Sequence, residues 1–147
     1  MRTKLLHEDA GLRTYALVLD RGDEVADCLK HFAAAERVTG ARVSAIGAFE
    51  RATMAFYDWE TKDYVDIPVD EQVEVASLNG DIGVEEDGSP ALHLHAVLGR
   101  RDGSAIAAHL KTGTVRPTLE IVLTETPAHL RRVKDAQTGL TLIRLDR

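Results

Sequence analysis

The stretch ALHLHAVLGRRDGSAIAAHL (residues 91–110) decides the fold. Two apolar runs flank the turn-forming segment GRRDGS (99–104), and this pattern predicts a β-hairpin. Side chains at positions i and i+2 of a strand point to the same face. His93, His95 and Val97 therefore share one face of the first strand, and two imidazoles in an apolar strand need a reason.

The hairpin brings a third histidine to the same place. If the turn is centred on Asp102, His95 lies opposite His109, and His93 is its diagonal neighbour. Opposed residues have Cβ atoms about 4.5–5.5 Å apart, and imidazoles bind Zn²⁺ at about 2.0–2.1 Å. We therefore predict a metal site at these three histidines. A register slip of one residue would turn His109 to the other face, and the alternative is a polar strand face without a metal.

Three neutral imidazoles suit Zn²⁺, and also Ni²⁺, Cu²⁺ or Fe²⁺. Three protein ligands leave one position open for water or substrate, as in catalytic zinc sites. Glu120 interrupts the apolar run TLEIVL (118–123) and is the candidate catalytic residue. It is predicted as a fourth ligand, as a partner that fixes a histidine tautomer, or as a general acid/base. The alternative is that Thr118, Glu120 and Thr124 face solvent.

The rest of the chain predicts an α+β fold, a mostly antiparallel sheet with one main helix. Val25, Leu29 and Phe32 recur at helical spacing, and Gly40 is expected just past the helix end. Residues 127–134 are expected to form a short helix. Strands are expected at 12–20, 41–59 (as two strands, or one bent at Gly47), 63–69, 71–88 with a break at Asn79-Gly80, 91–99, 118–126 and 140–146.

Length and composition narrow the class of protein. The 147 residues predict one domain over 1–147. The single cysteine, Cys28, allows no intrachain disulfide, which fits a cytoplasmic location. No segment approaches the about 20 apolar residues of a membrane span, so no membrane partner is expected. The net charge of −6 disfavours non-specific nucleic-acid binding.

Four segments resemble the PPC (plants and prokaryotes conserved) domain family: IGAFERATMAFYD (46–58), VEVASLNGDIG (73–83), PALHLHAVLGRRDGSAIAAHL (90–110) and TLEIVL (118–123). The most specific part is HLH…HL followed by the glutamate-containing strand. The resemblance implies a compact α+β fold, a homotrimer and a metal site at His93, His95 and His109. The implied fold is also similar to that of acetolactate decarboxylase, a zinc enzyme with its own His-x-His…His ligands.

The chain departs from the family pattern in two respects. Ala107 and Ala108 stand where the family often has two glycines, which puts a tight backbone approach there in doubt. The RGRP-like minor-groove hook of plant members is absent, so the DNA-binding label of the family transfers poorly to this acidic chain.

Three hypotheses remain open at this point. The chain is a PPC-domain protein with a divalent metal, zinc by preference, whose family is labelled DNA-binding or regulatory. Alternatively, it is a metal-dependent decarboxylase, lyase or hydrolase acting on a small oxygen-rich molecule, with Glu120 as acid/base. In the third hypothesis, the metal only stabilises the trimer.

Overall fold

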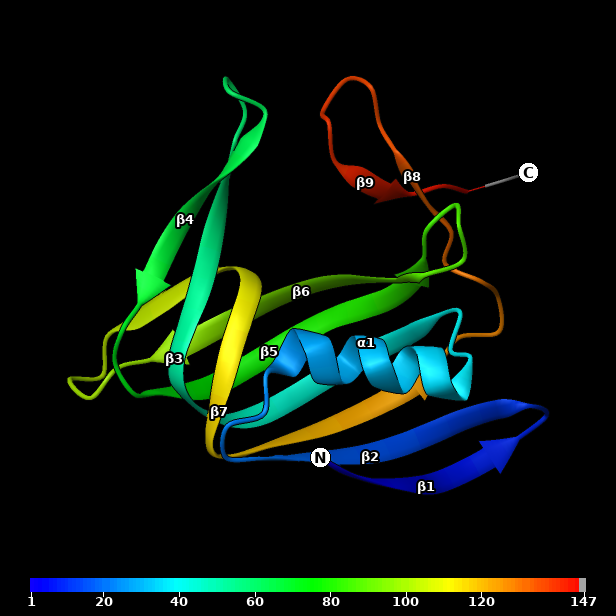
Figure 1. The fold of residues 1–147 in the computed structure, drawn as a ribbon, viewed down its shortest axis with the longest axis horizontal. Coiled ribbons are helices and arrows are strands. Elements are labelled where there is room, and N and C mark those ends of the chain that lie inside the picture. The colour runs from blue at the N-terminus through cyan, green and yellow to red at the C-terminus, as the bar shows by residue number, and fades with distance from the viewer. Residues whose placement is uncertain (146–147) are drawn as a thin grey trace.

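The computed structural model describes residues 1–145, and within them the chain forms a rolled antiparallel sheet with one helix against it (Figure 1). The elements are β1 (Arg2–Asp9), β2 (Leu12–Asp20), α1 (Val25–Glu36), β3 (Ala41–Asp58), β4 (Asp63–Val69), β5 (Val73–Val84), β6 (Pro90–Gly99), β7 (Ala105–Glu125), β8 (Arg132–Lys134) and β9 (Thr141–Ile143). The predicted α+β class is confirmed.

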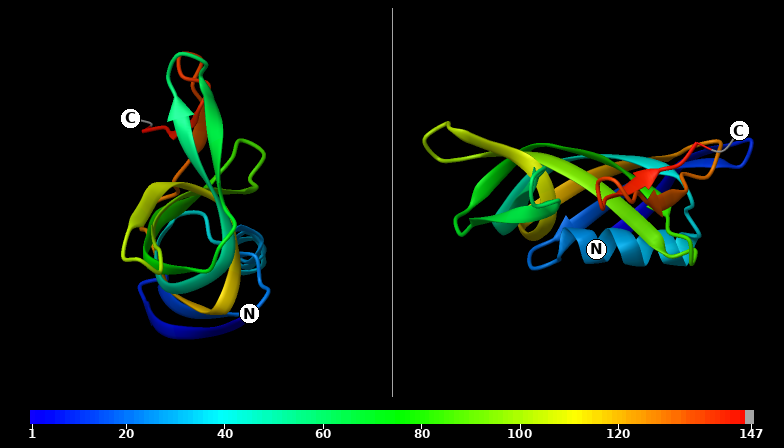
Figure 2. Two further views of the ribbon diagram at one scale, coloured as in Figure 1. Left: turned by 90° about the vertical axis from the view of Figure 1, so that its left-hand side faces the viewer. Right: turned by 90° about the horizontal axis from the view of Figure 1, so that it is seen from above.

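The main sheet has the strand order β1-β2-β7-β6-β5-β3-β4, and a further β7–β3 pairing joins strands from its two halves. This pairing rolls β7, β6, β5 and β3 into a ring, which Figure 2 shows end-on with α1 along one side. The rolled sheet encloses an apolar core that includes the fully buried Phe49, Leu98 and Leu119.

Glycines allow the long strands to bend and to approach one another. β3 is one continuous strand with a register shift between Ala45 and Gly47, where φ of Gly47 is 153°. A Cβ on Gly47 would overlap the Thr118 carbonyl oxygen, so the close approach of β3 to β7 requires a glycine here. The predicted break at Asn79-Gly80 is wrong, because β5 runs through it. A Cβ on Gly80 would overlap the His93 carbonyl oxygen, so this glycine serves close strand packing rather than a turn.

Helix α1 begins at an acidic cap and ends earlier than Gly40. The Glu24 carboxylate accepts a hydrogen bond from the Asp27 amide at 2.8 Å. Arg37 adopts the left-handed conformation, with φ 55°, and closes the helix by donating its N–H to backbone carbonyls of the last turn. Predicting Gly40 as the helix terminator was therefore wrong. A Cβ on Gly40 would meet the Thr126 hydroxyl at 2.5 Å, so close packing requires this glycine.

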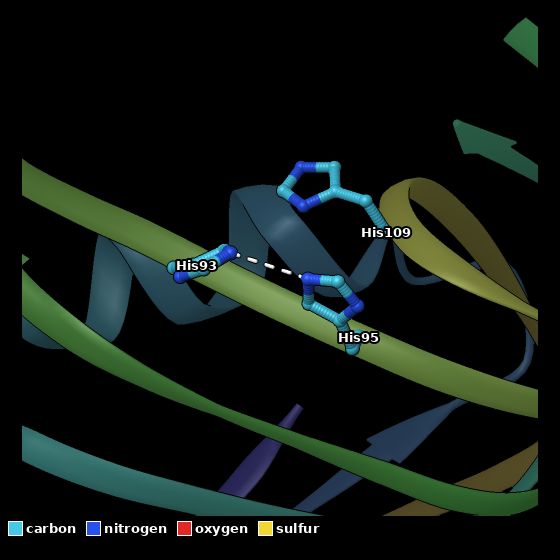
Figure 3. Close-up of side chains that lie close together, drawn as sticks. All are labelled: His93, His95 and His109. Carbon is cyan, nitrogen blue, oxygen red and sulfur yellow. Dashed lines mark hydrogen bonds between the residues drawn. The ribbon is translucent and has the colours of Figure 1, made fainter. Parts of the chain in front are cut away.

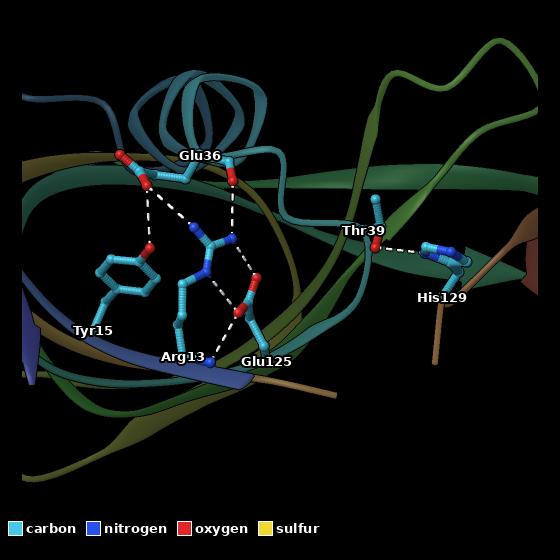
Figure 4. Close-up of polar contacts among 6 residues, drawn as sticks. All are labelled: Arg13, Tyr15, Glu36, Thr39, Glu125 and His129. Atoms are coloured by element: carbon cyan, nitrogen blue, oxygen red, sulfur yellow. Dashed lines mark hydrogen bonds and ion pairs between the residues drawn. The ribbon is translucent and has the colours of Figure 1, made fainter. Parts of the chain in front are cut away.

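A polar cluster fixes the end of α1 to the sheet (Figure 4). The Arg13 guanidinium on β2 donates to Glu125 on β7 at 2.7 Å and to the backbone carbonyl of Glu36 at 2.9 Å. The Tyr15 hydroxyl donates to the Glu36 carboxylate at 3.1 Å, and its ring meets Phe32 edge-on with centroids 5.0 Å apart. These contacts join β2, α1 and β7 beside the core.

The chain ends differ most from the sequence prediction. The exposed edge strand β1 was not predicted, since all of its residues are exposed and it has no buried face. The helix predicted at 127–134 is wrong: a loop leads into β8, which pairs with β9. Asp135 favours this hairpin by accepting hydrogen bonds from the Thr138 amide and hydroxyl at 2.8 and 2.7 Å. The strand predicted at 140–146 is observed as β9, and Asp146 lies outside the described residues.

Two hairpins extend beyond the ring on one side, the ends of β3–β4 and the β8–β9 hairpin (Figure 1). The Tyr57 hydroxyl on β3 connects them by donating to the Thr138 carbonyl at 2.7 Å. In the described part of the chain, no helix has the length and apolar character needed to cross a membrane.

Candidate metal centre

The β6–β7 hairpin has the predicted register. His95 pairs with His109, and pairing continues without a shift through Ala96–Ala108 and Val97–Ala107 to the end of the hairpin. Ala107 and Ala108 therefore fit the ladder in place of the glycines that the family often has. The turn is held by Asp102, which accepts from the Ser104 amide at 2.9 Å.

The three histidine rings converge (Figure 3). One ring nitrogen from each of His93, His95 and His109 lies within 4.8 Å of the others. The Nε2 atoms of His93 and His95 are 3.2 Å apart. The ring centroids are 5.1 Å (His93–His95), 5.5 Å (His93–His109) and 5.4 Å (His95–His109) apart. The geometry thus brings the three predicted ligands together.

Two of the rings are held in the neutral form that a metal requires. Burial, and then the positive charge of His93, His95 and Lys111, lower the pKa of His109 to about 4. Burial also lowers the pKa of His93, helped by the charge of Arg132 and opposed by Asp81. Neutral imidazoles offer a lone pair to a metal at neutral pH.

A second, independent observation indicates that the three histidines fit a divalent metal. The Nδ1 atom of His109 is buried and has no hydrogen-bond partner in the described part of the chain. A buried polar atom without a partner is costly, and a bound ligand or ion would supply the missing interaction. The Tyr64 ring lies against His109, with centroids 4.8 Å apart and planes 31° from parallel, and restricts the orientation of the imidazole.

The structure does not bring Glu120 to the histidines. Glu120 lies on the exposed face of β7, between the buried Leu119 and Ile121, and pairs with Val18 and Ile46. The candidate metal-binding group among the described residues contains the three histidines and no carboxylate. The acidic side chain beside the site is instead Asp81, which is opposite His93 in the β5–β6 register. The catalytic role of Glu120 stays a prediction.

A pocket of about 340 Å³ opens beside the site. Its lining includes His93 and His109, Tyr57 and Tyr64 from the β3–β4 hairpin, and Arg132 and Leu142 from the β8–β9 hairpin. Arg132 was not predicted as a site residue, because it lies in the segment 127–134 that was expected to form a short helix. The alternation in DYVDIPV (63–69) could have identified the face on which Tyr64 lies.

The remaining histidines are not part of the candidate metal-binding group. His7, His31 and His129 are all exposed. The His129 Nδ1 is 2.6 Å from the Thr39 hydroxyl (Figure 4).

Comparisons with known proteins agree with the fold. The family model of the Plants and Prokaryotes Conserved (PCC) domain matches residues 6–127. A plant- and prokaryote-conserved (PPC) protein from Pyrococcus horikoshii superposes with a TM-score of 0.85 at 29% identity, covering 92% of this chain and 93% of its own. A search of the curated proteins finds no match.

Two further solved structures carry functional descriptions. A "putative DNA binding protein" from Bacteroides thetaiotaomicron has a TM-score of 0.86 and 28% identity, with 91% of this chain and 93% of that chain covered. A "metal-containing protein" from Archaeoglobus fulgidus has a TM-score of 0.84 and 28% identity, with 99% of both chains covered.

Proposed function

The chain belongs to the PCC domain family, and from this premise we propose that it is a zinc protein whose metal is held by His93, His95 and His109. The observation that carries the proposal is the convergence of three imidazoles, one of which has a buried nitrogen without a partner. The metal content of the Archaeoglobus relative is in line with it.

Zinc is the metal we favour among those that accept three imidazoles. Structural zinc sites are closed by four protein ligands, whereas catalytic sites have three and one open position. The described side chains supply three, and His95 is exposed, so the group is accessible from solvent. Zinc held in this way supplies a Lewis acid that polarises a bound oxygen.

Elemental analysis tests the proposal. We expect about one equivalent of zinc per chain after purification without chelator, and a loss of most of it in His93→Ala. His31→Ala is the matched control, since His31 is exposed on α1 and remote in sequence from the hairpin. Equal metal content in the two variants would contradict the assignment.

A metal-dependent enzyme is the second candidate, favoured by the pocket of about 340 Å³ beside His93 and His109. A site that only stabilises the protein has no need of a hollow of this size. In this proposal a small oxygen-rich substrate enters the pocket in a decarboxylase, lyase or hydrolase reaction. Zinc-dependent turnover of such compounds, lost in His93→Ala, is the expected result. A zinc-loaded protein that binds none of them argues against it.

We also propose that the chain assembles as a homotrimer in the cytoplasm. Support comes from large apolar side chains left exposed on the sheet, with Ile46 exposed by 61% and Val122 by 48%. These lie in the β3–β7 pairing, where Ser44 pairs with Val122 and Ile46 with Glu120. Light scattering with and without a chelator gives the mass of the assembly and tests whether metal is needed to maintain it.

DNA binding is the function we favour least, although a structural neighbour is described in those terms. A net charge of −6 opposes the counterion release that drives non-specific binding. We expect no binding of labelled duplex DNA at low salt, where phosphate-driven affinity is largest.

A further inference from the structure

Arg132 is a buried cation at the edge of the candidate metal site. Its side chain is 4% exposed. Nη2 donates to the Asp81 carboxylate at 2.6 Å, and Nη1 donates to the Thr141 carbonyl at 2.9 Å. Nε is buried without a partner in the described part of the chain. A guanidinium has five N–H donors, so the protein leaves part of this buried cation unpaired.

The pocket that Arg132 lines combines this cation with an apolar surface. Tyr57, Tyr64 and Leu142 supply apolar surface, and His93 and His109 lie beside them. Inorganic anions gain nothing from such a surface, whereas the carbon skeleton of an organic acid does.

The charges around the pocket limit the ligand to no more than one negative charge. Asp81 already neutralises part of the Arg132 charge. Lys62 also lines the pocket, but Asp63 and Glu85 line it too, so the four charged lining groups balance. A carboxylate presents one negative charge and two oxygens, which match the guanidinium edge.

We propose that the pocket binds a small organic monocarboxylate, with Arg132 as the group that recognises the carboxylate. This inference rests on the proposed function in that it names the ligand class of the same pocket, and it can be tested without metal. In a ligand with a hydroxyl group on the carbon next to the carboxylate, this hydroxyl group is then expected to lie toward His93 and His109.

The experiment compares two probes of nearly equal shape, 2-hydroxyisobutyrate and its neutral amide, 2-hydroxyisobutyramide. Binding is measured by NMR titration of metal-free and zinc-loaded protein. We expect the carboxylate to bind at least about tenfold more tightly than the amide, since hydrogen bonds to charged groups are the stronger ones. Equal affinity of the two probes for both protein forms would overturn the proposal.

Arg132→Gln is expected to remove the preference for the carboxylate. Arg131→Gln is the matched control, because Arg131 is the exposed neighbour of Arg132 and does not line this pocket. Arg132 also borders a second hollow of about 570 Å³ that Arg131 lines. Loss of the preference in Arg131→Gln, with retention in Arg132→Gln, would place the carboxylate there and overturn the assignment.

Asp81→Asn keeps the arginine and removes its counter-charge, so it remains informative if Arg132→Gln fails to fold. We expect it to tighten carboxylate binding by roughly threefold, because Asp81 is 24% exposed and solvent in part screens its charge. If Arg132 only holds the β8–β9 hairpin in place, Asp81→Asn should not tighten carboxylate binding, and that result would overturn the proposal.

The results for metal-free and zinc-loaded protein distinguish a failure of the carboxylate assignment from a failure of the metal assignment. A protein that takes up no zinc but prefers the carboxylate through Arg132 disproves the metal site alone. A zinc-loaded protein that binds the carboxylate equally in wild type and Arg132→Gln disproves the role of Arg132 alone, because the metal then accounts for the binding.

Discussion

Acidification of the metal-free protein is expected to weaken its fold through His109. The pKa of this imidazole is about 4 in the folded chain, against about 6.5 in an unfolded one. Between these values the unfolded state binds a proton that the folded state does not. Stability is therefore complete above pH 6.5 and falls as the pH decreases toward 4.

The size of the effect follows from the two pKa values. At pH 5 the full difference corresponds to about 2 kcal/mol, and screening of a half-buried ring reduces the expected loss to about 1 kcal/mol. The lowered pKa of His93 acts in the same direction. Other groups also titrate, so the absolute slope does not isolate His109, but a comparison with His109→Asn does.

The assay is urea unfolding followed by circular dichroism at pH 7.5 and pH 5, in EDTA, for the wild type and His109→Asn. The wild type should lose about 1 kcal/mol more than the variant on acidification. The same pH dependence in both proteins would refute the assignment of a buried, neutral His109.

Three other changes test the packing of the strands, the polar cluster at the end of α1 and the core. Gly80→Ala should lower zinc affinity and the thermal midpoint, because its Cβ would overlap the His93 backbone, whereas Gly99→Ala, with no neighbour nearer than 3.8 Å, should change neither. Arg13→Met should cost about 2 kcal/mol in urea unfolding, since it leaves Glu125, 10% exposed, without its cation. Phe49→Ala should cost about 3–5 kcal/mol, and Phe56→Ala, at an exposed position, close to nothing.

The part of the site that the sequence predicted correctly depends on local chemistry. The turn around Asp102 is made by neighbouring residues: Gly103 supplies a φ of 84°, and the Ser104 hydroxyl donates to the Asp102 carboxylate. A local turn fixes the register of the strands on either side. The pairing of His95 with His109 could therefore be worked out by counting from the turn.

The incorrect predictions involve residues whose role depends on distant segments. Gly80 resembles a turn residue, and only the backbone of β6 explains its position in a strand. Arg132 lies in the segment predicted as a short helix, and its burial and its contacts with Asp81 on β5 and Thr141 on β9 appear only in the fold. The β3–β7 pairing, which closes the ring, has no local sequence signal at all.

The carboxylate beside the histidines depends on both local and distant structure. Glu120 was chosen because it interrupts an apolar run, yet strand alternation places it on the outer face between Leu119 and Ile121. Asp81 was not singled out in the sequence, where a break was predicted at Asn79-Gly80. Since β5 continues through that point, Asp81 comes opposite His93, where its charge raises the pKa of the imidazole and opposes the effect of Arg132. The carboxylate that tunes this site and holds Arg132 in place is therefore Asp81, and its substitution should alter both metal and anion binding.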